Sequence, residues 1–215
     1  MRVLVYVEGR SDRLAMEALL KPLLEKKRQE GVAIRFIDMN GKGALLTKIP
    51  KRAANILLHP PSSIVVALPD LYPPNEAFPH ETPEQLTGEL ARRFEEALQT
   101  KSKEVDERVR KRFRVFCFKH DLEALLLAAE TALGRRLAAR SLKRSWRVPV
   151  EDQDHERPPK RVVEELFAQH GQRYQATVDA PLILGSASYA TIADLCTQCF
   201  RPFVEFLEAL VPEAA

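Results

Sequence analysis

The chain has 215 residues, of which 45% are hydrophobic and 29% charged, and its formal net charge is +3. This size fits one globular domain with or without an extension, and so small a charge does not by itself indicate a nucleic-acid-binding protein. No apolar run reaches the roughly 18 residues of a membrane-spanning helix, and three cysteines do not suggest a disulfide framework. Because the chain begins with a strand pattern and not with a leader, we expect a cytoplasmic protein without a membrane partner.

The first half of the chain alternates between strand and helix patterns. Apolar, β-branched runs predict strands, and the segments between them have helical periodicity. We expect strands at residues 3–7, 32–37, 64–68 and 114–118, and helices at 12–27 (kinked at Pro22), 44–58, 82–100 and 121–130. This order predicts an α/β fold over residues 1–131, with a mostly parallel four-stranded sheet flanked by helices.

The pattern changes after residue 131. Residues 132–160 are basic, then acidic and then proline-rich, which predicts a short helix followed by an irregular loop. Helical patterns return at residues 159–170 and 190–210. We therefore expect a second unit, residues 132–215, made of a basic segment and a helical C-terminal extension packed on the first unit.

Two features suggest contacts with phosphate groups. The basic segment contains Arg135, Arg136, Arg140, Lys143, Arg144 and Arg147. Because no acid dilutes these charges and Leu142 and Trp146 are interleaved with them, we favour contact with nucleic acid over a solvated surface. The second feature is Lys42, which lies between two glycines at a helix start and could hold a phosphate, although a simple loop is the alternative.

Acidic residues follow each predicted strand. Glu8 follows the first strand, Asp38 the second, Asp70 the third, and Glu123 lies one helical turn after the fourth. The carboxyl ends of parallel strands meet at one edge of a sheet, where ligands bind in open α/β folds. Crowded carboxylates repel one another unless a cation neutralises them, and hard oxygen ligands suit Mg²⁺ or Mn²⁺. We expect a divalent-cation site at this edge.

Several of these segments resemble a Toprim domain, the metal-binding fold of topoisomerases, primases and OLD-family nucleases. The resemblance is carried by Val-Glu-Gly-Arg-Ser-Asp at residues 7–12 and by the strand at 64–70 that ends in an aspartate. It extends over nearly the whole chain to a family of stand-alone Toprim-like proteins of uncharacterised function, which are related to the OLD-family nucleases. The further segments are residues 18–24, 120–126, 158–161 and 174–203.

The resemblance implies a role for each acid. Glu8 would be the Toprim glutamate, a metal ligand or general base, and Asp12 would bind metal beside it. Asp70 would be the first aspartate of the Asp-x-Asp pair, and Glu123 the additional acid of OLD-like relatives. Glu8, Asp70 and Glu123 are thus the expected catalytic residues and, with Asp12, the expected metal ligands.

The chain departs from the Toprim pattern at one position. The second aspartate of the pair is expected at residue 72, which is tyrosine, and Tyr72 cannot replace a carboxylate as a ligand of a hard cation. Either Glu76 or Glu123 supplies the missing charge, or the site binds metal weakly, or it is inactive.

The function implied by the resemblance is divalent-metal-dependent cleavage of phosphodiester bonds in DNA or RNA. Because OLD-like nucleases join an ATPase to a Toprim domain, a separately encoded ATPase partner and an anti-phage role are also implied. The alternative is a non-catalytic nucleic-acid-binding or regulatory subunit with a degenerate site.

Overall fold

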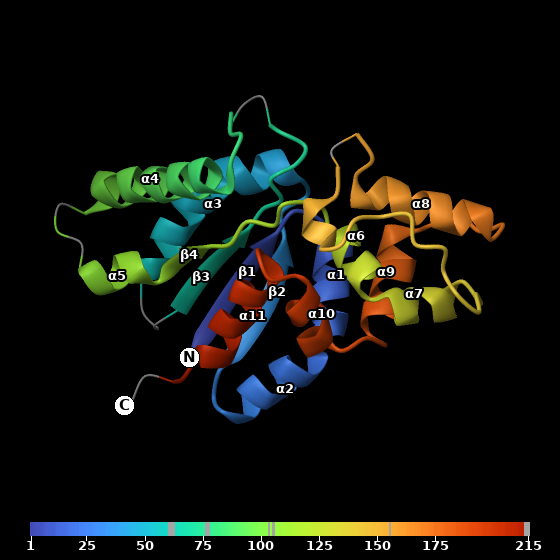
Figure 1. Ribbon diagram of the computed structural model, residues 1–215. Helices are drawn as coiled ribbons and strands as arrows, with labels where there is room; N and C mark the ends of the chain where they lie inside the picture. The colour runs from blue at the N-terminus through green and yellow to red at the C-terminus, as the bar shows by residue number, and fades with distance from the viewer. Residues whose placement is uncertain (60–62, 76–77, 103, 105, 155, 213–215) are drawn as a thin grey trace.

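The structure, a computed structural model, describes residues 1–59, 63–75, 78–102, 104, 106–154 and 156–212 (Figure 1). A parallel sheet with the strand order β2-β1-β3-β4 lies at its centre. The strands are β1 (Arg2–Val7), β2 (Ala33–Asp38), β3 (Ser63–Leu68) and β4 (Phe113–Val115). The predicted α/β fold with a four-stranded parallel sheet flanked by helices is therefore confirmed.

The central strand β1 brings the strand ends together. Its residues from Val3 to Val7 are buried, as expected for a strand covered on both faces. Val7, its last residue, is paired with Asp38 of β2 and with Leu68 of β3. The residues that follow β1 and β3 therefore leave the sheet at the same edge.

Strand β4 is shorter than the sequence predicted. The chain nevertheless continues alongside β3 after Val115, because Phe116 donates to the carbonyl of Ala67 and Phe118 donates to that of Pro69 at 2.9 Å. An isolated bridge pairs Asp70 with Phe118. The segment that leads from β4 to the next helix is thus held beside the loop after β3.

The two faces of the sheet bury alternate side chains of β1. Val3, Val5 and Val7 pack in one hydrophobic cluster with α1 (Arg10–Leu19), α2 (Lys21–Gln29) and α11 (Phe200–Ala209). Leu4 and Tyr6 pack in a second cluster with α3 (Lys42–Leu57) and α4 (Pro83–Lys101). This alternation follows from the two-residue period of a strand.

Prolines define the ends of two helical segments. The expected kink at Pro22 is a complete break, because α1 ends at Leu19 and α2 begins at Lys21, with Pro22 in its first turn. Helix α4 begins as predicted: Thr82 accepts a hydrogen bond from the backbone N–H of Gln85, and Pro83 occupies the first helical position.

The later helices differ from the prediction in their number. The expected helix at residues 121–130 is α6 (Glu123–Ala128), and α7 (Glu130–Arg136) lies near the short helix expected at the start of residues 132–160. The short α5 (Glu107–Lys111) and α9 (Ala176–Leu184) were not predicted. Helix α8 (Pro159–Gln169) was predicted, but the expected helix at residues 190–210 is α10 (Tyr189–Leu195) followed by α11. A single 3₁₀ turn, Val150–Asp152, lies in the predicted irregular loop.

The break between α10 and α11 is caused by a buried acid that is distant in sequence. The carboxylate of Glu151, 4% exposed, accepts hydrogen bonds from the backbone N–H groups of Gln198 and Cys199, each at 2.8 Å, and from that of Phe200. An acid at the start of a helix satisfies donors that have no partner within the helix. Glu151 therefore defines where α11 begins.

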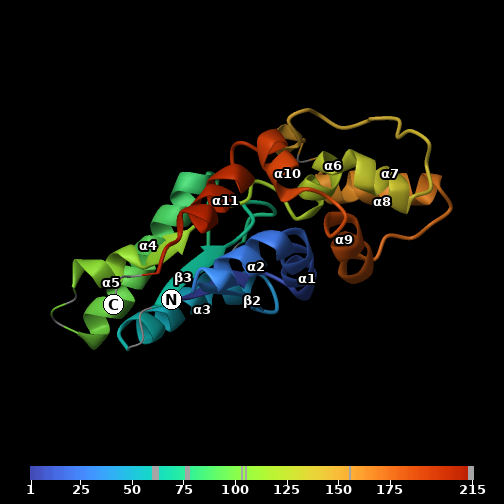
Figure 2. The ribbon, with the colours of Figure 1, turned by 90° about the horizontal axis from the view of Figure 1, so that it is seen from below.

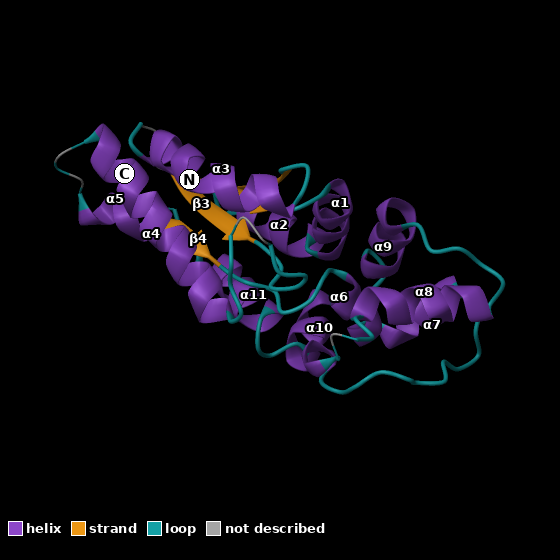
Figure 3. Cartoon of the chain, turned by 90° about the horizontal axis from the view of Figure 1, so that it is seen from above, coloured by secondary structure: helices purple, strands orange, loops and turns teal. Residues whose placement is uncertain are grey.

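Helices α6 to α9 gather beyond the sheet on the side of α1, far from α4 and α5 (Figures 1 and 2). Figure 3 shows the long loop that joins α7 to α8 passing around this group of helices. The domain boundary expected between residues 131 and 132 lies within α7, and a division into two units stays a prediction. None of the helices in the described part of the chain has both the length and the hydrophobicity needed to cross a membrane.

Candidate functional site

Glu8 and Asp70 meet at the edge of the sheet, where the sequence placed them. Glu8 follows the last residue of β1, and its Oε1 accepts a hydrogen bond from the backbone N–H of Asp70 at 2.9 Å. Burial raises the pKa of Glu8 to about 7, against the opposing effects of this hydrogen bond and of the Lys42 ammonium. Burial also raises the pKa of Asp70 well above its usual value, and the charges of Glu8, Asp12 and Asp121 raise it further.

Asp12 closes the turn between β1 and α1. Its Oδ2 accepts a hydrogen bond from the backbone N–H of Gly9 at 2.7 Å, while Ser11 donates a long bond of 3.4 Å to Oδ1. The N-cap of α1 is thus Gly9, and Asp12 reaches back to it from the first turn. Burial raises the pKa of Asp12, Asp38 adds to the increase, and Lys160 opposes it.

Asp121 and Glu123 form a second pair of acids, after β4. Burial raises the pKa of Asp121 to about 7, and the charge of Glu123 raises it further. The Oδ1 atom of Asp121 is buried and has no hydrogen-bond partner among the described residues. Glu123 is only 4% exposed, and burial raises its pKa too. Lys160, at the start of α8, partly offsets both negative charges.

Asp12 connects the two pairs electrostatically. Burial raises the pKa of each carboxyl in both pairs, and the charge of Asp12 raises each of them further. Within the described residues, however, no three aspartate, glutamate, histidine or cysteine side chains are close enough to hold one metal ion. The acids thus form two pairs, Glu8–Asp70 and Asp121–Glu123, and the charge of Asp12 acts on both. The assignment of Glu8, Asp12, Asp70 and Glu123 as metal ligands stays a prediction.

Tyr174 brings the C-terminal half of the chain to the second pair. Its hydroxyl donates a hydrogen bond to Oε1 of Glu123 at 2.9 Å. Burial and the charge of Glu123 raise the pKa of Tyr174, so that the hydroxyl keeps its proton and acts as the donor. No feature of the sequence linked Tyr174 to an acid.

Sequence reasoning also missed Asp121 and Lys160 as site residues. Asp121 lies two positions before Glu123, in the same segment that resembled a Toprim element, so a signal for it was present. Lys160 lies 37 residues after Glu123 and had no comparable signal, because only the packing of α8 on α6 brings it to the acids.

Lys42 has partners within the protein. Its Nζ donates to the carbonyls of Leu71 at 2.9 Å and Pro73 at 2.5 Å, so it holds the loop after β3. Gly41, whose φ of +119° favours glycine, donates its N–H to the carbonyl of Glu8 at 2.7 Å. The start of α3 is therefore joined to the ends of β1 and β3, and the expected phosphate contact of Lys42 stays a prediction.

Of the three other residues considered for the site, Asp38, Tyr72 and Glu76, the structure describes the first two. Asp38 is paired with Arg13 at 2.8 Å, which neutralises its charge. Tyr72 lies with its ring centroid 5.9 Å from that of His120, at an interplanar angle of 32°. Glu76, one of the two acids expected to compensate for Tyr72, lies outside the described residues.

The predicted nucleic-acid-binding residues of the basic segment, four arginines and Lys143, fall into two classes: those that are paired within the protein and those that are not. Arg136 binds the buried carboxylate of Asp179 at 2.5 Å, and Arg144 is paired with Glu130 and lies over the Trp146 ring. The remaining predicted contacts are exposed side chains that have no ion pair within the described structure, namely Arg135, Arg140 and Lys143. For all five, contact with nucleic acid stays a prediction.

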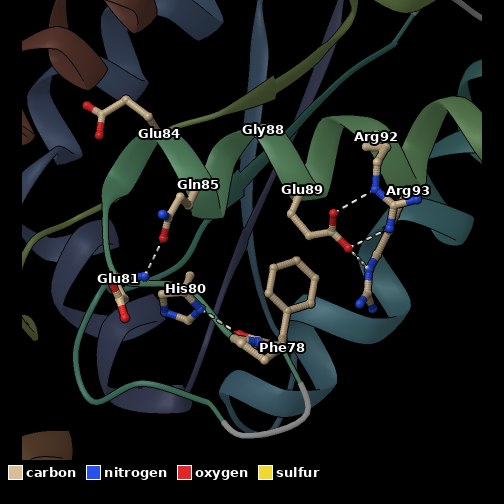
Figure 4. Close-up of a pocket in the computed structure, with 10 residues that line it drawn as sticks. Phe78, His80, Glu81, Glu84, Gln85, Gly88, Glu89, Arg92 and Arg93 are labelled. Atoms are coloured by element: carbon tan, nitrogen blue, oxygen red, sulfur yellow. Dashed lines mark hydrogen bonds and ion pairs between the residues drawn. The ribbon is translucent and has the colours of Figure 1, made fainter.

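A surface hollow of about 630 Å³ lies at the first half of α4, and none of the five acids lines it (Figure 4). Its side chains bind one another: Glu89 is paired with Arg92 and Arg93, and the Arg93 guanidinium lies 4.2 Å from the centroid of the Phe78 ring. The buried His80 ring contacts the carbonyls of Phe78 at 2.7 Å and Leu71 at 2.9 Å. These contacts join the segment that leads into α4 to Leu71, in the loop after β3, and to Arg93 of α4.

Comparisons with known proteins complete this description. None of the curated proteins matches the chain. Among solved structures, it is similar to the C-terminal region of the Burkholderia pseudomallei OLD protein, with 18% identity, a TM-score of 0.49 and 96% of each chain covered. It is also similar to the C-terminal region of the Xanthomonas campestris pv. campestris OLD protein, with 16% identity, a TM-score of 0.46, and 96% of this chain and 93% of that chain covered. A family model matches residues 7–208, and the chain therefore belongs to the family described as "Domain of unknown function (DUF4276)".

Proposed function

We propose that this protein cleaves phosphodiester bonds in DNA or RNA with the help of Mg²⁺ or Mn²⁺. The observation that carries the proposal is the convergence of Glu8, Asp12 and Asp70 with the pair Asp121 and Glu123 at the carboxyl edge of the sheet. Their raised pKa values come from burial and mutual repulsion, and a bound cation opposes both effects because its positive charge favours the ionised form.

The donor set fits a hard divalent cation. Carboxylate oxygens are its preferred ligands, and the buried Oδ1 of Asp121 lacks a partner within the described residues. A cation would be held by one pair of acids, either Glu8 with Asp70 or Asp121 with Glu123, and its remaining ligands would be water or the phosphates of the substrate. A bound cation supplies Lewis-acid polarisation of a phosphoryl oxygen and neutralises charge on a phosphodiester.

The residues of the chain contribute proton transfer and charge balance. Burial raises the pKa of Glu8 to about 7 when no cation is bound to it, so Glu8 can accept a proton near neutral pH if it acts as the general base and not as a metal ligand. Lys42 and Lys160 offset part of the negative charge of the acids. The exposed side chains Arg135, Arg140 and Lys143 would bind the phosphates of the substrate away from the acids.

The resemblance to Toprim domains of OLD-like nucleases supports an ATPase partner and a role in anti-phage defence as further parts of this proposal. This part of the proposal rests on analogy of fold and motif.

A second candidate function is favoured by Tyr72. Where the Toprim pattern has its second aspartate, this side chain offers no carboxylate. A chain that binds nucleic acid or a partner without cleaving would tolerate this replacement. The alternative is therefore a non-catalytic nucleic-acid-binding or regulatory subunit.

Cleavage assays with Glu8→Gln test the two functions. Glutamine keeps the shape of the side chain and an oxygen that can accept the Asp70 hydrogen bond, but it removes the charge. We expect wild type and the control Glu25→Gln, an exposed acid of α2, to cleave plasmid or single-stranded DNA or RNA with Mn²⁺, and Glu8→Gln to be inactive. Equal cleavage by wild type and Glu8→Gln without metal would contradict the proposal. Tight nucleic-acid binding by an inactive wild type would favour the alternative.

A further inference from the structure

Tyr174 connects the helical C-terminal part of the chain to the acids at the sheet edge. It lies in the short connection between α8 and α9, 51 residues after Glu123, and its hydroxyl donates to Oε1 of Glu123 at 2.9 Å. Because Glu123 is only 4% exposed, little water competes for this oxygen. The bond thus joins a residue of the expected second unit, residues 132–215, to an acid of the expected first unit, residues 1–131.

The surrounding packing fixes the position of the Tyr174 ring. On one side the ring packs against Phe167 of α8, with 5.1 Å between the ring centroids. The backbone after Tyr174 is also held, because the next residue, Gln175, donates its N–H to the buried carboxylate of Asp179 at 2.7 Å. Arg136 binds the same carboxylate and lies over the Phe167 ring. Side chains from α7, α8 and α9 therefore hold the hydroxyl in one place.

We infer that Tyr174 is a positioning residue that orients the carboxylate of Glu123 beside Asp121, so that the C-terminal helices prepare this pair of acids to bind a cation. This inference rests on the proposed metal-dependent function. A carboxylate at the start of a short helix can rotate about its side-chain bonds, and a hydrogen bond to one oxygen restricts that rotation. Groups that orient metal ligands in this way affect metal affinity although they do not touch the metal.

The chain offers an internal comparison for this bond. Tyr189 donates to Oε1 of Glu208 at 3.2 Å, which is the same pair of side chains in an exposed setting between α10 and α11. A change of tyrosine to phenylalanine removes one hydroxyl in both places. The two variants therefore separate the positioning of Glu123 from the general effect of losing such a bond.

The test is Mn²⁺ binding to the full chain, measured by electron paramagnetic resonance of the free ion. We expect Tyr174→Phe to bind Mn²⁺ on the order of 10- to 100-fold more weakly than wild type, the range seen when an outer partner of a metal ligand is removed. Tyr189→Phe should bind Mn²⁺ like wild type. Thermal unfolding of both variants without metal verifies that each is folded.

A double-mutant cycle distinguishes positioning from a purely structural role. If Tyr174 acts through Glu123, then adding Tyr174→Phe to Glu123→Gln should weaken Mn²⁺ binding no further. Unchanged Mn²⁺ affinity in Tyr174→Phe, or an equal loss in both backgrounds, overturns the inference while leaving the proposed function intact. If the folded wild type binds no Mn²⁺, the proposed function and the inference are both overturned.

Discussion

The carboxylate of Glu8 accepts a hydrogen bond from the backbone N–H of Asp70 at 2.9 Å, and this bond joins the end of β1 to the loop after β3. The two residues are 62 positions apart in sequence, but the parallel pairing of their strands brings them together. The bond also means that a buried acid is held next to a second buried acid. The burial of Glu8 is the basis of the first prediction.

Replacing Glu8 by glutamine should stabilise the metal-free protein above neutral pH. Because burial raises the folded-state pKa of Glu8 to about 7, its contribution to stability is fully present below its unfolded pKa and is lost as the pH rises through about 7. A glutamine at this position does not ionise, so the variant does not lose this contribution to stability as the pH rises. We expect Glu8→Gln to exceed wild type by roughly 1–3 kcal/mol at pH 8 and to match it at pH 4.

Urea unfolding at both pH values measures this difference. Mg²⁺ should reduce it at pH 8 by stabilising the ionised wild type, since a ligand that binds only the folded state stabilises that state. Equal stability of the two proteins at pH 8 without metal would mean that Glu8 is well solvated.

Removing the three exposed basic side chains should weaken nucleic-acid binding. In the variant Arg135→Gln, Arg140→Gln and Lys143→Gln, the slope of log affinity against log salt should become shallower by about 0.9 for each duplex-DNA phosphate that the protein no longer neutralises. Salt-dependent fluorescence anisotropy measures both effects. The control is the double variant Lys48→Gln and Lys51→Gln, which removes two charges from the exposed face of α3. If both variants bind nucleic acid like wild type, the basic segment is only a solvated surface.

Arg136→Gln should affect stability rather than binding alone. The substitution leaves Asp179, which is 2% exposed, without its charged partner, although Gln175 still donates to it. We expect a loss of about 2–4 kcal/mol of unfolding free energy, because an unpaired buried charge is costly. Arg144→Gln, which breaks the more exposed pair with Glu130, should change the unfolding free energy by less than about 1 kcal/mol. Denaturant unfolding compares the two, and equal effects would contradict this interpretation.

Tyr72→Asp should strengthen Mn²⁺ binding. The substitution restores the second carboxylate of the Asp-x-Asp pattern beside Asp70, where a further hard oxygen ligand is expected to matter. Calorimetric titration with Mn²⁺ should show tighter binding than in wild type, whereas Tyr72→Asn, which adds a carbonyl oxygen without charge, should show a smaller gain. If the aspartate variant is folded but binds no more tightly, residue 72 does not face the metal site.

The sequence by itself determined the sheet and the edge at which Glu8 and Asp70 meet. Alternating strand and helix patterns predicted the parallel sheet, and β-branched runs ending in Glu8 and Asp70 placed those acids at one edge. Pro22 and Thr82 indicated the positions of helix boundaries, because a proline or an N-cap residue affects the hydrogen bonds of the backbone next to it. These features are local, so a single sequence can reveal them.

The helices of the second half show where local patterns fail. Helix α9 was missed because Ala-Thr-Val-Asp-Ala-Pro-Leu-Ile-Leu is apolar nearly all round and has no amphipathic period. The division between α10 and α11 depends on Glu151, whose carboxylate binds backbone groups 47 to 49 positions away. Within residues 190–210, Pro202 in the first turn of α11 was a local signal of a helix boundary, but the partner of the N–H groups that precede α11 lies outside that segment.

The membership of the site was decided by tertiary structure. Asp38 follows a strand as Glu8 does, but Arg13 pairs with it, and Arg136 belongs to a buried ion pair in spite of its place in a basic run. Lys160 and Tyr174 join the acids only because the C-terminal helices fold back beside α6. Which charges neutralise one another depends on distances and burial across the fold, and these arise only when distant segments pack together.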